Sequence, residues 1–335
     1  MGKIYTKEGW INWDWIMNDP AIFVMGIGPR GVGKTYGIFK WCIDHQEKFI
    51  YCRRLKTQLD MCATTSGNPF NKLNKDLHIE IKPFKSEGVV SFRYDNRSGD
   101  EVACGVSLST LATLRGIDFS TYNVIIFDEA VPMTGEKPIK NEFEAFLNFV
   151  ETVSRNREIL GDKPVKVILL GNANKLNNPY FSGWKFTKTA LKMLRGNQMI
   201  YRTPDKTRMM IMFQDSPISS RKADTALYKN ANDGFVAMAL DNAFRTDETK
   251  IKSEPLIEYS HLVSVGEIGI YKHKSDRKYY VSSQQSQPYY SGYGIQLKMF
   301  QQVYFMLRIS YMTLKNFYFE DYESELLFRE YFDLN

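Results

Sequence analysis

The chain has 335 residues, of which 43% are hydrophobic and 14% aromatic, so it can bury a sizeable core and form two domains. Its net charge of +6 favours an acidic partner such as nucleic acid without requiring one. It has no secretory signal and no uninterrupted run of 18 apolar residues, and its four cysteines contain no C-x-x-C pair. We therefore expect a protein of the reducing cytosol without a membrane segment, a zinc site or a disulfide framework.

Three tryptophans, Trp10, Trp13 and Trp15, precede the turn residues 18–20 near the start of the chain. They form an aromatic flap that leads into the first strand. The flap could be a lid over the core, or it could contact a nucleotide base or a neighbouring subunit.

An octapeptide after the apolar run 21–25 fills each fixed position of the phosphate-binding P-loop pattern. Its glycines let the backbone curl so that successive N–H groups point at phosphate oxygens. We expect Lys34 to reach the terminal phosphates of ATP and Thr35 to offer its hydroxyl to Mg²⁺. A helix from here to about Asp44 would place the positive end of its dipole under the phosphates. The predicted nucleotide-binding residues are Gly28, Pro29, Arg30, Gly31, Val32, Gly33, Lys34 and Thr35.

A short β-rich run, 49–52, follows this helix and ends in the cations Arg53, Arg54 and Lys56. These cations could touch the phosphate of a nucleotide or of a nucleic acid, or they could be solvated. Residues 66–100 are expected to form a peripheral insertion with a strand around 89–94, and 102–108 is expected to be another strand.

A second chemical element is the apolar run 124–127, which is followed by Asp128 and Glu129. Such a run indicates a buried parallel strand, and open parallel sheets bind ligands at the tips of their strands. We expect Asp128 to hold Mg²⁺ and Glu129 to orient or deprotonate the attacking water. This is the arrangement of a Walker B strand with a catalytic glutamate in an ATP hydrolase.

The clearest predicted helix spans 141–154, with Asn141 as its N-cap and Phe143, Phe146, Leu147, Val150 and Val153 on one face. Arg155 and Arg157 follow it, and these cations could complement the helix dipole or act as a finger on a neighbour's nucleotide. Asn172 follows the buried strand 165–170, where it could sense the terminal phosphate or serve only as a turn residue.

The composition changes near residue 208, where a hydrophilic tract begins. We predict an ATPase domain over 1–207, a linker over 208–250 and a small α+β domain over 251–335. The ATPase domain should be an α/β P-loop fold of the ASCE or RecA-like type, with helices on both faces of a parallel sheet. The last domain should contain short antiparallel strands at 260–265, 268–273 and 278–283, and helices at about 295–315 and 321–332.

These elements together resemble the genome-packaging ATPases of small podophages of the φ29 type. The resemblance covers nearly the whole chain and rests on the P-loop and on segments 49–56, 127–129, 152–158, 172, 178–181 and 240–244. It implies a homo-oligomeric ring, a homopentamer, that hydrolyses ATP to drive double-stranded DNA through the portal of a procapsid. It places the protein in the host cytoplasm, transiently docked on the procapsid.

The resemblance also implies roles for particular residues and domains. The arginine that matches Arg155 acts in trans as the finger, with Arg157 as the weaker candidate. The C-terminal domain is similar to a ribonuclease H-like fold that has lost its metal site, and Glu267, Asp276 and Asp321 show no strand-tip arrangement, so nuclease activity is not expected. Close relatives carry a packaging RNA, and the sequence does not show whether one is needed here.

Other functions remain open at this level. DNA phosphates would be gripped by basic loops, for which Lys56, Lys137 and Lys140 are the candidates. The main alternative is a P-loop ATPase in another nucleic-acid role, such as a helicase or a replication-initiation factor. A small-molecule kinase would need an acceptor pocket and lid arginines, and a non-enzymatic scaffold would bind ATP without hydrolysing it.

Overall fold

The structure is a computed structural model that describes residues 4–86, 88–114, 116–133, 136, 139–172, 176, 178–214, 216–231, 236, 250–314 and 316–334. The fold divides into two compact units. The first comprises Met1–Asn174 and Met193–Phe244, and the second comprises Lys175–Lys192 and Arg245–Asn335. None of the described helices is long and apolar enough to cross a membrane.

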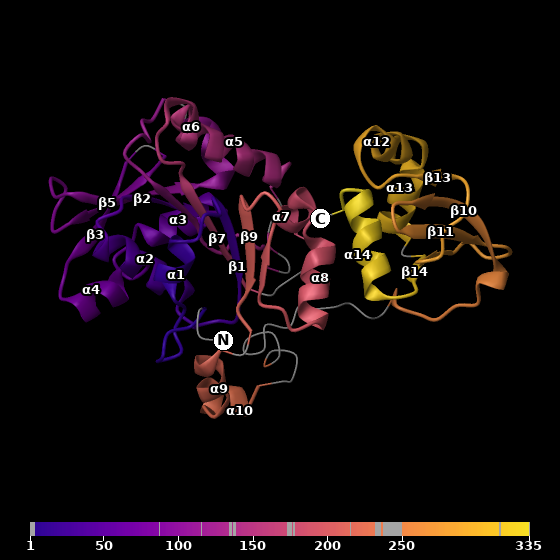
Figure 1. The fold of residues 1–335 in the computed structure, drawn as a ribbon, viewed down its shortest axis with the longest axis horizontal. Coiled ribbons are helices and arrows are strands. Elements are labelled where there is room, and N and C mark those ends of the chain that lie inside the picture. The colour runs from indigo at the N-terminus through magenta and orange to yellow at the C-terminus, as the bar shows by residue number, and fades with distance from the viewer. Residues whose placement is uncertain are drawn as a thin grey trace. The chain divides into compact units, whose positions relative to one another are not determined.

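The first unit is built on one nine-stranded sheet with the order β3-β4-β5-β2-β6-β7-β1-β9-β8 (Figure 1). Strands β5, β2, β6, β7, β1 and β9 run parallel to their neighbours, and antiparallel pairs add β4 and β3 at one edge and β8 at the other. The strand β7 between β1 and β6 separates the P-loop strand from the Walker B strand, as expected for an ASCE fold. The strands are β1 Phe23–Ile27, β2 Phe49–Arg53, β3 Ile81–Lys85, β4 Val90–Tyr94, β5 Glu101–Ser107, β6 Val124–Phe127, β7 Lys166–Gly171, β8 Ile200–Arg202 and β9 Arg208–Met212.

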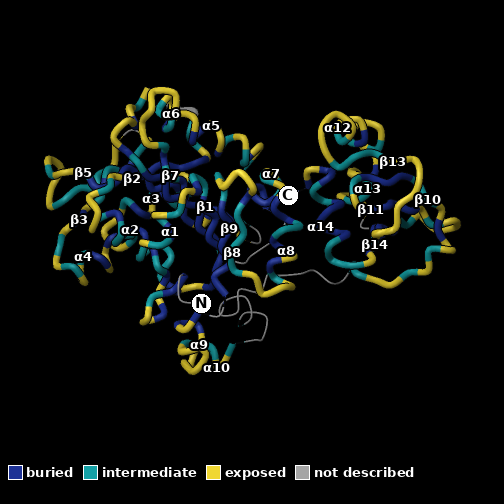
Figure 2. The backbone as a smooth tube through the Cα atoms, in the orientation of Figure 1, coloured by how far each residue is buried: buried dark blue, intermediate teal, exposed yellow. Residues whose placement is uncertain are grey.

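Both faces of this sheet are apolar and covered by helices, because alternate residues of each central strand point to opposite sides. One face packs against α1 Trp13–Met17, α2 Lys34–Asp44, α3 Lys56–Cys62 and α4 Asn71–Leu77, and Tyr51 of β2 meets Phe39 of α2 there. The other face meets α5 Glu142–Ser154, where the rings of Phe127 and Phe146 lie 6.0 Å apart. The central strands are buried throughout (Figure 2), so the predicted α/β class with helices on both faces is confirmed.

The helix at 142–154 forms as expected, and Asn141 occupies its N-cap position, with φ of 50° and no capping hydrogen bond from its side chain. The predicted buried face of the helix is wrong in part. Phe149 is buried and Leu147 is 40% exposed, so the buried face is rotated from the predicted one. The rotation follows from Glu142, which is buried in an ion pair with Arg54 and so adds a polar anchor that an apolar pattern does not reveal.

The predicted linker over 208–250 is wrong at its beginning, because Arg208–Met212 is β9 and pairs with β1 inside the sheet. The chain continues in the first unit through α9 Pro217–Ala223 and α10 Ala226–Lys229. The hydrophilic tract had suggested an earlier boundary, but Met209 to Phe213 are fully buried and so belong to the core. Residues 232–235 and 237–249 of the predicted linker lie outside the described residues.

The second unit has a five-stranded sheet with the order β13-β10-β11-β12-β14. The three consecutive strands β10, β11 and β12 are antiparallel to one another, and a fourth strand, β13, pairs in parallel with β10. This arrangement fits the ribonuclease H-like expectation, whereas β14 lies parallel to β12 at the opposite edge. The strands are β10 Tyr259–Val265, β11 Ile268–His273, β12 Tyr279–Ser282, β13 Tyr289–Tyr290 and β14 Phe317–Phe319.

The core of the second unit lies between this sheet and its helices, around Val263, Ile270, Phe317 and Phe328. The predicted helix at 295–315 is two helices, α12 Gly294–Val303 and α13 Phe305–Leu314, and the last helix is α14 Tyr322–Tyr331.

The segment Lys175–Lys192 also belongs to the second unit, so the prediction of a C-terminal domain formed by 251–335 alone is wrong. This segment contains α7 Pro179–Trp184 and most of α8 Thr187–Arg195. Lys188 forms an ion pair with Glu267, and the ammonium of Lys185 lies 5.5 Å from the ring centre of Tyr293. Such long-range contacts leave no signature in local composition.

Candidate nucleotide-binding site

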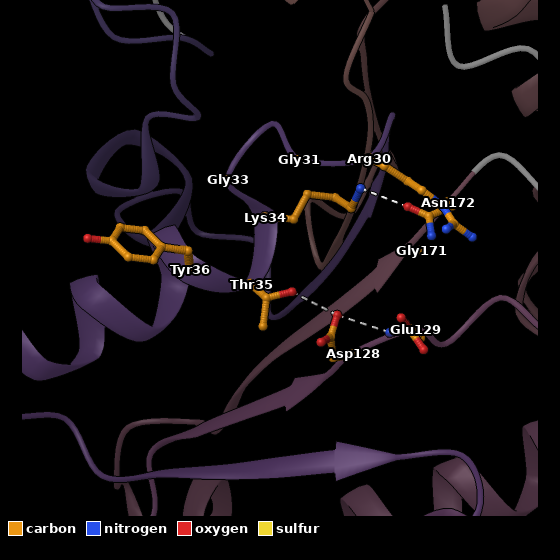
Figure 3. A pocket seen from close by; sticks show the side chains of 10 residues that line it. All are labelled: Arg30, Gly31, Gly33, Lys34, Thr35, Tyr36, Asp128, Glu129, Gly171 and Asn172. Atoms are coloured by element: carbon orange, nitrogen blue, oxygen red, sulfur yellow. Dashed lines mark hydrogen bonds between the residues drawn. The ribbon is translucent and has the colours of Figure 1, made fainter. Parts of the chain in front are cut away.

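The predicted nucleotide residues meet at one edge of the first sheet, where β1, β6 and β7 end side by side. Most of them line a pocket of about 300 Å³, but Gly28, Pro29 and Val32 do not, and Val32 is fully buried in the core. Figure 3 shows the P-loop and the start of α2 on one side and the residues that follow β6 and β7 on the other. The lining residues are Arg30, Gly31, Gly33, Lys34, Thr35, Tyr36, Asp128, Glu129, Gly171 and Asn172.

The P-loop connects β1 to α2 through a backbone that only glycine adopts readily. Gly31 and Gly33 have φ of 72° and 87°, in the left-handed region where a side chain is strained. Gly28 packs so tightly on Phe213 that an added Cβ would lie 2.7 Å from the Cβ of that phenylalanine. The turn therefore aims the first N–H groups of α2 into the pocket, where they can receive phosphate oxygens.

Lys34 lies at the centre of the pocket. Its ammonium donates to the carbonyl oxygens of Gly28 and Pro29 at 2.8 and 2.6 Å, and to Asn172 Oδ1 at 3.0 Å. The predicted neighbourhood of Lys34 and Asn172 is thus present. Burial lowers the pKa of Lys34 to about 8, although the charge of Asp128 opposes this shift.

This lowered pKa predicts that ATP binding takes up a proton at alkaline pH. The empty folded protein binds fewer protons than the unfolded chain between about pH 8 and 10.5, so this lysine makes folding more favourable as pH rises through that window. A phosphate in the pocket favours the charged ammonium and reverses the shift. At pH 9, calorimetry in buffers of different ionisation enthalpy should show uptake of most of a proton, and at pH 7 almost none.

Lys166 offers a matched control, because burial also lowers its pKa to about 8 but it lies outside the pocket. The Lys166→Met variant should retain the proton uptake that accompanies ATP binding at pH 9. Equal proton uptake at pH 7 and pH 9 would contradict the assignment to Lys34.

Thr35 and Asp128 form the second contact of the pocket. The Thr35 hydroxyl donates to Asp128 Oδ1 at 3.0 Å, and Asp128 is only 7% exposed. A hydroxyl and a carboxylate that face each other are oxygen ligands of the kind that Mg²⁺ takes, with water completing the shell. The residues present therefore fit the predicted Mg²⁺ site.

Glu129 follows Asp128 in a left-handed conformation with φ of 53°, and its side chain is 46% exposed. Its backbone N–H donates to Asp128 Oδ1 at 3.1 Å, and its side chain is more exposed than that of Asp128. The Glu129 side chain lines the pocket, where it can reach a water molecule placed next to the terminal phosphate.

Arg53 contacts both acids, a role that no pattern in the sequence indicates. Its guanidinium lies 3.4 Å from Asp128 Oδ2 and forms an ion pair with Glu129, and it donates to the Tyr51 hydroxyl at 3.2 Å. In the sequence, Arg53 is one of three cations, with Arg54 and Lys56, that follow the strand 49–52. The parallel register of β2 with β6 brings it beside Asp128, and this register could not be read from the sequence.

The two candidate finger arginines differ sharply in their surroundings. Arg157 donates to Asn123 Oδ1 at 3.3 Å and to the carbonyls of Phe119 and Ser120 at 3.2 and 2.6 Å, so it holds α6 Arg157–Leu160 to its own unit. Arg155 is exposed and makes one long hydrogen bond, 3.4 Å, to the carbonyl of Ile117.

Two of the three candidate DNA contacts, Lys56 and Lys140, lie among the described residues. Lys56 is half exposed and paired with Asp60 at 2.7 Å on the same helix. Lys140 is exposed, and Lys137 lies outside the described residues. Their role in DNA binding stays a prediction.

The chain matches known proteins over most of its length. The model of the podovirus DNA encapsidation protein (Gp16) family matches residues 5–289. The DNA packaging protein of Bacillus phage phi29 is 31% identical over 182 residues, which are 53% of this chain and 48% of that protein. The DNA packaging protein of Bacillus phage B103 is 30% identical over 228 residues, which are 66% of this chain and 64% of that protein. The alignments thus span about half to two thirds of the curated relatives' length.

Two solved structures share the fold over nearly the whole chain. The phi-28 gp11 DNA packaging motor has a TM-score of 0.59 and 17% identity, and covers 98% of this chain and 99% of that one. The bacteriophage phi-29 viral genome packaging motor assembly has a TM-score of 0.57 and 18% identity, and covers 96% and 99%. With the match of the family model to residues 5–289, the chain belongs to the podovirus DNA encapsidation protein (Gp16) family.

Proposed function

We propose that this chain is the ATPase subunit of a viral DNA-packaging motor. The observation that carries the proposal is the contact between Thr35 and Asp128, which lie 93 positions apart and meet in one pocket with Lys34. This is the pairing that a Mg²⁺–ATP site of the P-loop type needs. Membership of the encapsidation family supports the coupling of this site to DNA packaging.

The residues of the pocket divide the chemistry of ATP hydrolysis among them. The backbone N–H groups of the P-loop and the Lys34 ammonium bind the phosphate chain, and Thr35 and Asp128 hold Mg²⁺, which neutralises charge on the phosphates. Glu129 orients the attacking water and takes its proton, and Asn172 binds the terminal phosphate or that water. Arg53 forms ion pairs with both acids and so offsets the repulsion between them.

The proposed motor is a homo-oligomeric ring, pentameric by the resemblance to φ29-type ATPases, in which each site is completed by Arg155 of the neighbouring subunit. The exposed position of Arg155 and the intramolecular bonds of Arg157 support Arg155 as the finger. Two structures with the same fold are named as a DNA packaging motor and a viral genome packaging motor assembly, which supports an assembly of subunits. Docking on the portal of a procapsid in the host cytoplasm is proposed from the resemblance to φ29-type ATPases.

Double-stranded DNA is the proposed substrate of translocation, gripped through its phosphates. Such binding is insensitive to base sequence and weakens steeply with salt. A motor of this kind moves along duplex DNA without unwinding it. Strand separation on a forked duplex would instead indicate a helicase.

ATP hydrolysis by mixed assemblies tests this proposal. Arg155→Ala alone should lower turnover by about 10³-fold, in the range found for arginine fingers. Mixing Arg155→Ala with Glu129→Gln subunits should recover turnover, because some interfaces then combine an intact Glu129 with an intact Arg155. Arg157→Ala is the matched control. We expect it to lower the free energy of unfolding, because Arg157 makes hydrogen bonds within its own unit, and we expect mixing with Glu129→Gln subunits not to restore that stability.

Two results would contradict the proposal at different levels. If Arg155→Ala hydrolyses ATP normally, or mixing restores nothing, each site is complete in its own subunit. If the wild-type protein does not hydrolyse ATP in the presence of DNA, the chain is not an ATPase motor.

A further inference from the structure

The helix α9 reaches the P-loop from outside the pocket. Its Lys222 ammonium donates to the carbonyl of Arg30 at 2.8 Å. It also lies so close to Gly31 that a side chain at that glycine would collide with it. The lysine therefore lies against Arg30 and Gly31, two residues that line the pocket, although it does not line the pocket itself and no pattern in the sequence marks it as a nucleotide residue.

Neighbouring residues of α9 contact segment 4–12, which carries Trp10 of the aromatic flap. Arg221 donates to the carbonyl of Glu8 at 2.7 Å, and Pro217 packs against Gly9. The same flap lays Trp10, which is 47% exposed, against Gly33 of the P-loop. Helix α9 thus bridges the flap and the phosphate-binding loop, near the N-terminus (Figure 1).

The charges around the pocket leave Lys222 without an anion. Among the described residues no carboxylate pairs with Lys222, and its neighbours Arg30 and Lys34 are also cations that disfavour one another's charge. Asp128 and Glu129 already contact Arg53. A bound polyphosphate would supply the negative charge that this side of the pocket lacks.

The segment that carries Lys222 also contains two buried polar atoms without a partner among the described residues. They are Oε1 of Gln214 and Oγ of Ser219, whose residues are 9% and 6% exposed. Unpaired buried polar atoms cost free energy, so these two atoms reduce the net stabilisation that the packing of this segment provides.

We propose that Lys222 is a nucleotide-binding residue. Its ammonium moves away from the carbonyl oxygen of Arg30 and binds the terminal phosphate of ATP. Arg30 lies on the side of the P-loop where Lys34 contacts Gly28 and Pro29, and Asn172 faces this side (Figure 3). The terminal phosphate is expected here, because the P-loop lysine reaches the last two phosphates. This inference rests on the proposed ATPase function.

Binding of ATP and ADP by the full-length chain tests the role of Lys222. Lys222→Ala should weaken Mg²⁺–ATP binding about tenfold, the loss of one charge-assisted hydrogen bond, and should change ADP binding by less than about twofold. Lys222→Gln is the discriminating variant. Its amide can still donate to the Arg30 carbonyl but carries no charge, so ATP binding should fall as in Lys222→Ala.

Lys229→Ala is the matched control, because Lys229 is an exposed lysine on the adjacent helix α10 with only a loose pair to Asp224 at 4.0 Å. It should bind both nucleotides like the wild type. Wild-type ATP affinity in both Lys222 variants, rescue by glutamine, or equal losses for ATP and ADP would each overturn the proposal. Failure of the proposed function is distinguishable, since the wild type itself would then not hydrolyse ATP in the presence of DNA, whereas failure of the Lys222 assignment leaves wild-type binding and hydrolysis intact.

Discussion

Replacing Glu129 by glutamine should reduce ATP turnover by about 10² to 10⁴-fold while leaving ATP affinity within about twofold. The amide keeps the size of the side chain but cannot take a proton from water. The phosphate contacts of Lys34 and the P-loop do not involve Glu129, so binding should persist. Single-turnover hydrolysis and direct binding of Mg²⁺–ATP measure the two quantities separately.

The folded structure should tolerate this substitution, because the Glu129 side chain is 46% exposed and its ion pair with Arg53 is replaced by a hydrogen bond. Glu80→Gln is the control, since Glu80 is an exposed acid that pairs with Lys82 far from the pocket. It should leave turnover unchanged. Turnover by Glu129→Gln within a few-fold of the wild type would show that another group activates the water.

Replacing Arg54 by methionine should destabilise the first unit by about 3–5 kcal/mol. Arg54 is fully buried, and its guanidinium contacts Glu142 through two bonds of 2.7 Å and Glu136 at 2.8 Å. Without the arginine, the carboxylate of Glu142, which is 4% exposed, loses this cation. Urea denaturation of the full chain, followed by the tryptophan fluorescence of the flap, measures the loss.

The double variant Arg54→Met, Glu142→Leu should recover much of this stability, because it removes the buried carboxylate together with its cation. Lys72→Met is the control for an exposed pair. Lys72 and Asp76 are 2.6 Å apart on α4 with the lysine 69% exposed, so its loss should cost about 0–1 kcal/mol. A cost for Arg54→Met as small as for Lys72→Met would contradict a structural role of the buried network.

Arg54 also links two parts of the proposed catalytic apparatus. It follows Arg53, which contacts Asp128 and Glu129, and it anchors the first turn of α5, which ends just before Arg155. The network thus connects the candidate site to the arginine that we propose as the finger for the neighbouring subunit.

The sequence by itself predicted the candidate nucleotide site, because the chemistry of its motifs is local. The P-loop places its glycines, Lys34 and Thr35 in one turn at the start of a helix, and Asp128 and Glu129 follow directly on an apolar strand. A contiguous motif has the same geometry wherever it occurs, so residue types and spacing were enough. The alternation of buried strands and helices likewise predicted the α/β class of the first unit.

Only the tertiary structure decided which distant residues join that site. The strand register brings Arg53 to the acids, and the pairing of β9 with β1 moves the predicted domain boundary. The loop 119–123 engages Arg157 and leaves Arg155 exposed, and the packing of α9 brings Lys222 to the P-loop. These contacts join residues far apart in the chain, and composition and spacing carry no information about which strands and loops become neighbours.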